Sequence, residues 1–101
     1  MATVTSKALA RTAAATSSTT LYTVPASTTA VVTDIAVCNS AATAATFTIT
    51  LDGVDLLKTV AIAANSTASF DLKQVLATTK IIAGFASAIT VSFHISGVEI
   101  A

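Results

Sequence analysis

The sequence predicts one all-β domain, an antiparallel β-sandwich similar to a jelly roll, with seven or eight short strands and an extended N-terminal arm. Three observations lead to this fold class. Apolar side chains alternate with Thr or Ser in several segments, as in strands that bury one face. Turn-forming residues separate these segments at intervals of about eight to twelve residues, and Thr, which favours strands, is abundant. We expect residues 1–18 to form the arm and residues 19–101 to form the sandwich.

The first strand of the sandwich is expected at residues 21–24. It ends at Pro25, because proline has no N–H to donate to a neighbouring strand. The next strand, at residues 31–39, alternates less regularly. We expect one of its faces to carry Val31, Ile35 and Val37 and the other to carry Val32, Asp34, Ala36 and Cys38.

Two later segments alternate most clearly. In residues 46–51, Phe47 and two aliphatic side chains share one face and three Thr share the other. Residues 89–96 repeat this arrangement, with Phe93 on the apolar face and His94 among Thr and Ser. Because one face of each strand packs on the core, the pattern predicts that Phe47 and Phe93 are buried and that His94 is exposed.

The remaining elements follow from turn signals. Asp52 and Gly53 stand between the strand at 46–51 and a strand at 54–60, and this dipeptide suits a two-residue hairpin turn. Small polar residues separate the later strands, and residues 73–77 are expected to form a single helical turn. The other strands are expected at residues 67–72 and 80–85.

The N-terminal arm lacks the alternation of the rest of the chain. Good helix formers favour a short helix at residues 7–15, which would be marginal alone, and the composition is also typical of a disordered terminus. A third interpretation is an extended arm that adds to the sheet edge of a partner subunit. On this interpretation the partner-binding residues are Val4, Lys7, Leu9 and Arg11, with Lys7 and Arg11 pairing with acidic groups.

Charge is scarce and balanced. Lys, Arg, Asp and Glu make up 10% of the chain and the net charge is zero, whereas soluble domains carry about 25% charged residues. We expect no nucleic-acid ligand, because neutralising phosphates requires a basic surface. No apolar run approaches the length of a membrane span, and the single cysteine fits synthesis in a reducing cytoplasm. A weakly charged exterior indicates that neighbouring subunits cover much of it, as in a homo-oligomer.

The sequence offers little for catalysis or cofactor binding, so we expect neither an enzyme nor a cofactor. His94 is expected to be a solvated surface residue, and Cys38 a packed thiol with no positive group to activate it. Asp52 and Asp55 lack the spacing of a calcium loop, and no zinc-ligand spacing occurs. Tyr22 could serve as a sugar-binding platform, but a core residue with its hydroxyl at the rim is favoured.

Three stretches carry a resemblance: LYTVPASTTAVVTDIAVCNSAATAATFTITLDG at 21–53, IAANSTASFDLKQVL at 62–76 and ITVSFHISGVEI at 89–100. Together they resemble a group of small β-sandwich structural proteins of tailed bacteriophages. The similarity spans about 80 of the 101 residues and consists of strands and turns without a functional motif. Two turns depart from the family: Ser27 stands where it usually has Gly, and Thr78 or Thr79 where another Gly precedes the penultimate strand.

The resemblance implies a virion component made in the host cytoplasm. The expected role is that of a capsid decoration or cement protein, which binds across subunits of the major capsid protein on the capsid surface and stabilises the head. A structural protein of the tail, baseplate or fibre is the alternative, and a carbohydrate or host-surface binding module is a third possibility. A dimer and a trimer are both compatible with the sequence.

Overall fold

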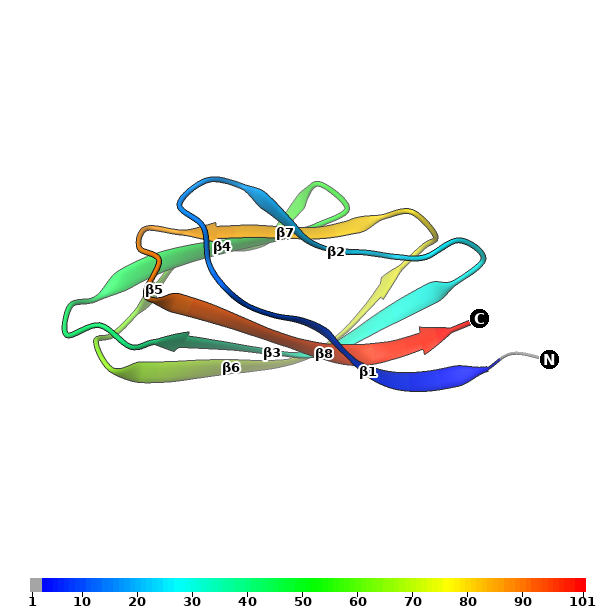
Figure 1. The fold of residues 1–101 in the computed structure, drawn as a ribbon, viewed down its shortest axis with the longest axis horizontal. Coiled ribbons are helices and arrows are strands. Elements are labelled where there is room, and N and C mark those ends of the chain that lie inside the picture. Colours follow the sequence, from blue (N-terminus) through cyan, green and yellow to red (C-terminus); the bar gives the residue numbers. More distant parts are fainter. Residues whose placement is uncertain (1–2) are drawn as a thin grey trace.

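The structure, a computed structural model, describes residues 3–101, and every element in that range is a β-strand (Figure 1). Eight strands pack as two layers, which confirms the predicted all-β sandwich. They are β1 (Val4–Ala13), β2 (Thr19–Thr23), β3 (Thr29–Asn39), β4 (Ala45–Leu51), β5 (Val54–Ile62), β6 (Ser66–Leu76), β7 (Ile81–Ala86) and β8 (Val91–Ile100).

The strand order is that of a jelly roll. The first sheet has the order β1-β8-β3-β6 and the second has the order β2-β7-β4-β5. Each strand of the first half therefore pairs with its counterpart in the second half: β1 with β8, β2 with β7, β3 with β6 and β4 with β5, all antiparallel. The chain is one long hairpin rolled into two sheets. The pair β3–β8 completes the first sheet, and the pair β4–β7 completes the second.

The tip of this long hairpin is the turn at Asp52 and Gly53. Their φ angles are 55° and 75°, and both are positive, as a two-residue hairpin turn requires. The predicted hairpin is thus confirmed. The Asp52 carboxylate also lies 3.6 Å from the Lys80 ammonium, which connects the turn to the segment before β7.

The core joins the two sheets through aromatic rings. Phe47 of β4 and Phe93 of β8 are buried and meet edge to face, with ring centroids 6.1 Å apart. Phe70 of β6 packs on Phe47 in the same manner at 6.2 Å. His94, next to Phe93, is exposed, so the predicted orientation of both segments is confirmed.

A β-bulge in β3 changes the expected faces of that strand. Val32 pairs with Gly97 and Asp34 pairs with the next residue, Ser96, so Thr33 is an extra residue on β3. The side-chain alternation shifts at this point. Val32 rather than Val31 shares the buried face with Ile35 and Val37, which corrects the sequence-based assignment.

Two segments differ from the expected secondary structure. Residues 73–77 do not form a helical turn, because β6 continues as an edge strand to Leu76. Residues 4–13 form strand β1, not a helix or a separate arm, and pair with β8 along its length. β1 is therefore a strand of the first sheet, next to β8. Residues 1 and 2 of the expected arm lie outside the described residues.

Candidate functional site

The four candidate partner-binding residues all lie on β1, an edge of the first sheet (Figure 1). Their environments differ. Val4 is 64% exposed and Arg11 is also exposed, whereas Leu9 is 6% exposed and belongs to the core. Lys7 reaches a carboxylate of its own chain. The side chains of Val4 and Arg11 are therefore free to contact a partner. Those of Leu9 and Lys7 attach β1 to the rest of the chain.

Leu9 enters the core because β1 contains a bulge. Ala8 pairs with Ser96 and Ala10 pairs with the adjacent Ile95, so Leu9 is the extra residue. Gly97 of β8 makes room at this point. A Cβ atom on Gly97 would overlap the carbonyl oxygen of Val31 and lie 2.9 Å from Leu9 Cδ1. Because glycine has no side chain, Gly97 allows β3 and the Leu9 side chain to approach β8 closely.

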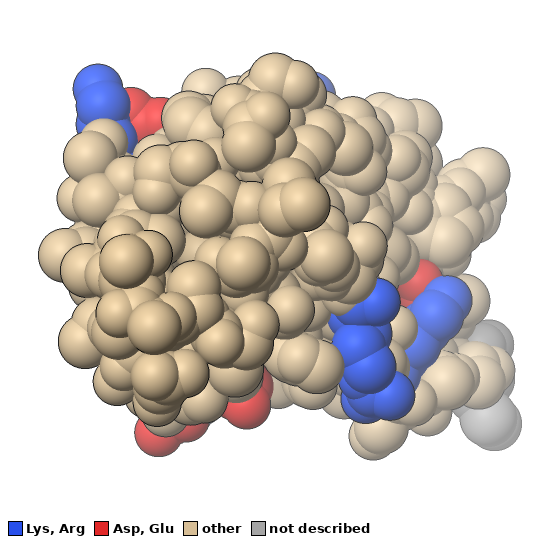
Figure 2. Space-filling model, turned by 60° about the vertical axis from the view of Figure 1, so that its left-hand side comes forward, with Lys and Arg blue, Asp and Glu red and all other residues tan. Residues whose placement is uncertain are grey.

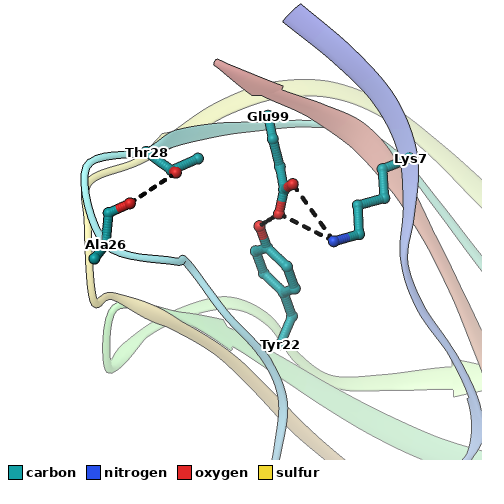
Figure 3. Close-up of polar contacts among 5 residues, drawn as sticks. All are labelled: Lys7, Tyr22, Ala26, Thr28 and Glu99. Atoms are coloured by element: carbon teal, nitrogen blue, oxygen red, sulfur yellow. Dashed lines mark hydrogen bonds and ion pairs between the residues drawn. The ribbon is translucent and has the colours of Figure 1, made fainter. Parts of the chain in front are cut away.

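A polar cluster of Lys7, Tyr22 and Glu99 connects the first sheet, which contains β1, to the second sheet (Figure 3). The Tyr22 hydroxyl, from β2 of the second sheet, donates a hydrogen bond to Glu99 Oε2, from β8 of the first sheet. Lys7 Nζ, from β1, lies 3.4 Å from both carboxylate oxygens of Glu99. Tyr22 is 9% exposed and the Glu99 side chain is 15% exposed. Three strands from two sheets therefore meet at one sheltered carboxylate.

The cluster shifts two pKa values in opposite directions. Burial, together with the hydrogen bond to Glu99, raises the pKa of the Tyr22 hydroxyl well above its ordinary value. The hydrogen bond from Tyr22, aided by Lys7, lowers the pKa of Glu99 although burial opposes this. At neutral pH the hydroxyl therefore keeps its proton and the carboxylate keeps its charge. The cluster thus links β1, β2 and β8 through one charged carboxylate.

Tyr22 is a core residue with its hydroxyl at the rim, as the sequence indicated. Cys38 is half-buried and lies on the face of β3 opposite to Val32, because the bulge separates the two residues. Asp55 forms an ion pair of 3.7 Å with Lys58. Nowhere in residues 3–101 do three or more His, Cys, Asp or Glu side chains gather in a way that could hold a metal ion.

A hollow of about 460 Å³ opens on the first sheet beside the β3 bulge. It is lined by Thr33, Asp71, Leu72 and Lys73. All but Thr33 belong to β6, which is the edge strand opposite to β1 in the same sheet. The hollow thus combines one aliphatic side chain with an acid and a base at a free sheet edge.

The charged side chains are few and mostly paired. The ion pairs are Lys7–Glu99, Lys58–Asp55 and Lys80–Asp52. Figure 2 shows a face covered almost entirely by uncharged side chains, with the charged groups at its margins. Such a face costs little desolvation when another protein covers it, because few ions lose their water.

Sequence reasoning missed Glu99 and Asn39. Glu99 is the only glutamate in the chain, but 77 positions separate it from Tyr22, so no sequence pattern connects the two. Asn39 is fully buried at the end of β3. Its amide donates to the carbonyl oxygens of Thr43 at 2.8 Å and Ala63 at 3.3 Å, and its oxygen accepts from the Ala41 N–H at 3.1 Å. This side chain fixes the loops after β3 and β5.

No protein-family model matches this chain, and no curated protein is similar enough to count as a relative. The part of the chain that the structure describes contains no helix long and apolar enough to cross a membrane.

Proposed function

We propose that this protein is a structural component of a bacteriophage virion, a capsid decoration protein that binds across subunits of the major capsid protein. The observation that carries the proposal is a jelly-roll body with an almost uncharged face. Jelly rolls recur in viral capsid proteins, but the fold alone does not assign a role. The uncharged surface supplies the physical argument. A cement protein stabilises a capsid through many individually weak contacts with the capsid subunits, and an uncharged surface forms such contacts at little desolvation cost.

The turns that depart from the phage family give a second line of support. Ser27 has a φ of 56° and Thr79 a φ of 70°. Positive φ values favour Gly, because a Cβ is strained there. The resembled family usually has Gly at Ser27 and at Thr78 or Thr79, so its preference agrees with the backbone that this chain adopts.

The proposed contact with the capsid includes the outer side of β1. Val4 and Arg11 point to solvent there and would meet the partner, with Arg11 pairing with an acidic group. Leu9 and Lys7 contribute indirectly, since they anchor β1 to the core and to Glu99. The strand thus presents a contact surface that is already ordered, which lowers the entropy cost of binding.

Copy number in purified virions tests the proposal. A decoration protein follows the capsid symmetry and is expected in on the order of tens to hundreds of copies per particle. Quantitative mass spectrometry, with the major capsid protein as internal standard, measures the number. A few copies per particle would assign the protein to the tail, baseplate or fibre, and complete absence from virions would overturn the structural role.

Decoration of heads in solution provides a direct binding test. Heads that lack the protein should bind it at a saturating, symmetric stoichiometry when the two are mixed and sedimented. An Arg11→Asp variant should bind more weakly, whereas Lys58→Asp, an exposed change of equal charge on β5 of the second sheet, should bind normally. Equal binding of both variants would show that β1 is not part of the contact with the capsid.

Glycan binding would indicate the third function. Sugar sites commonly use exposed aromatic rings, and the only tyrosine, Tyr22, is buried with its hydroxyl bonded to Glu99. We therefore expect no glycan-dependent signal when the purified protein is applied to a glycan array. A specific signal would favour host-surface binding over decoration.

A further inference from the structure

All four edge strands of the two sheets are bulged or irregular. In the first sheet, β1 has an extra residue at Leu9, and β6 has one at residues 72–73, opposite Thr33 of β3. In the second sheet, β2 has an extra residue at Leu21 and β5 shifts register twice. Bulges at an edge disfavour the addition of a further strand. Association through the outer face of a sheet is therefore favoured over association through an edge.

The outer face of the first sheet, the lower layer in Figure 1, carries an aliphatic patch. The other face packs on the core, so alternate side chains of each strand point outward. Val98 of β8 lies opposite Val31 of β3, which lies opposite Val75 of β6 beyond its bulge. In the next row, Ile100 of β8 lies opposite Val4 of β1. Directly opposite residues share a face, so these five side chains form one patch.

This aliphatic patch is open to solvent in the single chain. Val4 and Val75 are 64% and 69% exposed, and the other three members are half-buried. Val54 and Ile89, which are exposed to a similar degree, lie apart from it, on β5 and in the turn before β8. Contiguous apolar patches mark interaction surfaces, whereas single exposed apolar side chains are ordinary.

The charges on the same face are divided between its two halves. Asp34 of β3 lies directly opposite Asp71 of β6, and neither carboxylate forms an ion pair within residues 3–101. Arg11 of β1, which also forms none there, lies in the next row, opposite His94 of β8. Even with Lys73 of the bulge counted, the β3–β6 half is negative, whereas the β1–β8 half is positive.

A second copy complements the charges of this face. A two-fold axis along the strands, midway between β8 and β3, places β8 of each copy over β3 of the other, and β1 over β6. Arg11 then lies over Ser69 of the second copy, one row from the unpaired Asp71. The exposed His94 lies over the small Ala36. Each cation therefore reaches an acid of the other copy.

The same axis brings the two aliphatic patches together. Val98 lies over Val31 of the second copy, and Ser6 lies over Val75, because each row of one face covers the same row of the other. Four strands about 4.8 Å apart, each about ten residues long at roughly 3.3 Å per residue, cover on the order of 600 Å². Specific interfaces bury about 600 Å² or more on each partner. The face is thus large enough for a specific dimer.

We propose that two copies of this protein form a dimer by packing the outer faces of their first sheets against each other about this axis. Contacts of this isologous kind close after two copies. Val4 and Arg11 also belong to the contact proposed with the capsid, so one copy cannot hold a second copy and the capsid through this face at the same time. The dimer does not rest on the virion role, since it is measured on the purified protein without heads.

Charge reversal tests the contact. Sedimentation velocity should give a dimer for the unaltered protein. Arg11→Asp and Asp71→Arg should each weaken the dimer by at least about tenfold, because either change brings like charges together across the contact. The double variant Arg11→Asp/Asp71→Arg should restore the dimer. Lys58→Asp alters the net charge as much as Arg11→Asp, but lies on the second sheet and should leave the dimer intact.

A cross-link locates the axis independently. In a Cys38→Ser background, a short bismaleimide should join two copies of Ser6→Cys/Val75→Cys, because these positions meet only between copies and lie on the two edge strands of the sheet within one chain. Ser6→Cys/Val54→Cys, with Val54 on the second sheet, should not be joined. Circular dichroism of each variant confirms that it is folded. A monomer at every concentration, a trimer, a dimer that survives both single charge reversals, or equal cross-linking of the two cysteine variants would overturn the proposal.

Discussion

At the scale of single residues, the bond between Tyr22 and Glu99 makes the stability of the protein depend on pH. The pKa of Glu99 in the folded protein is lower than its ordinary value of 4.5, because Tyr22 and Lys7 stabilise the charged carboxylate. A lowered pKa adds stability above pH 4.5, and this contribution is lost as the pH falls through the lowered value. The pKa of Tyr22 is raised from 10.0, so its contribution is complete below pH 10 and is lost at higher pH.

The variant Tyr22→Phe isolates this bond. We expect it to be less stable than the unaltered protein at pH 7 and to lose less stability on acidification, because its Glu99 has a pKa closer to the ordinary value. Urea denaturation at pH 7 and at pH 3 measures both effects. A difference between the two proteins that stays the same at both pH values would show that the carboxylate charge is not involved.

The strained turn before β7 gives a second residue-scale prediction. Thr79 is β-branched and has a φ of 70°, a conformation that Gly adopts without strain. Thr79→Gly should therefore raise the free energy of unfolding by about 0.5–1 kcal/mol, since relief of strain exceeds the added flexibility of the unfolded chain. Thermal denaturation followed by circular dichroism checks the change.

The adjacent residue provides the matched control. The Thr78 hydroxyl accepts a hydrogen bond from the Thr28 N–H at 3.0 Å and donates one to the Thr28 carbonyl oxygen at 2.6 Å. Thr28 in turn donates from its own hydroxyl to Ala26 at 3.0 Å (Figure 3). Thr78→Gly should lower stability by about 1–2 kcal/mol. If both glycine variants changed stability in the same direction, backbone strain at Thr79 would not be the cause.

At the scale of elements, β1 is held mainly by one side chain. Leu9 is the only residue of β1 that is buried, and the other positions are exposed apart from the half-buried Ala10. We expect Leu9→Ala to lower the free energy of unfolding by about 2–3 kcal/mol, whereas Arg11→Ala should change it by less than about 0.5 kcal/mol. Chemical denaturation of both variants makes the comparison, and equal effects would mean that β1 is not anchored through the core.

The position of β1 also changes the expected result of truncation. A free arm could be removed without loss, but removal of β1 takes away the partner of β8 and uncovers a long strand edge next to the core. Loss of capsid binding by such a truncated protein would therefore not identify a contact. Point changes at exposed β1 residues such as Arg11 are the informative variants.

At the scale of the whole molecule, the rolled hairpin predicts slow folding. The first strand, β1, pairs with the last strand, β8. Val4 lies opposite Ile100, so nearly the whole chain lies between these two paired residues in the sequence. Distant pairings close large loops, and all-β sandwiches fold on the order of milliseconds to seconds. Tyr22 is the only tyrosine and the chain has no tryptophan, so tyrosine fluorescence reports when Tyr22 reaches Glu99. Stopped-flow refolding should show this signal on that timescale, and recovery within the mixing time would contradict the prediction.

Much of the fold could be predicted because strands with one buried face repeat every two residues. The orientation of Phe47, Phe93 and His94 and the turn at Asp52 and Gly53 followed from this periodicity. The errors arose where the periodicity breaks. The bulge at Thr33 moved Val32 to the core, and the bulge at Leu9 buried a side chain in a segment that shows no alternation.

By itself, the sequence determined the all-β class, most strand positions and the weakly charged surface, because local backbone preference and composition need no distant partner. Only the tertiary structure decided that β1 belongs to the first sheet, that Glu99 joins Tyr22 and Lys7, and that β6 is left as an open edge. These features depend on which strands become neighbours after the hairpin rolls up. Pairings between residues far apart in the chain are fixed by packing of the whole core, which no local pattern encodes.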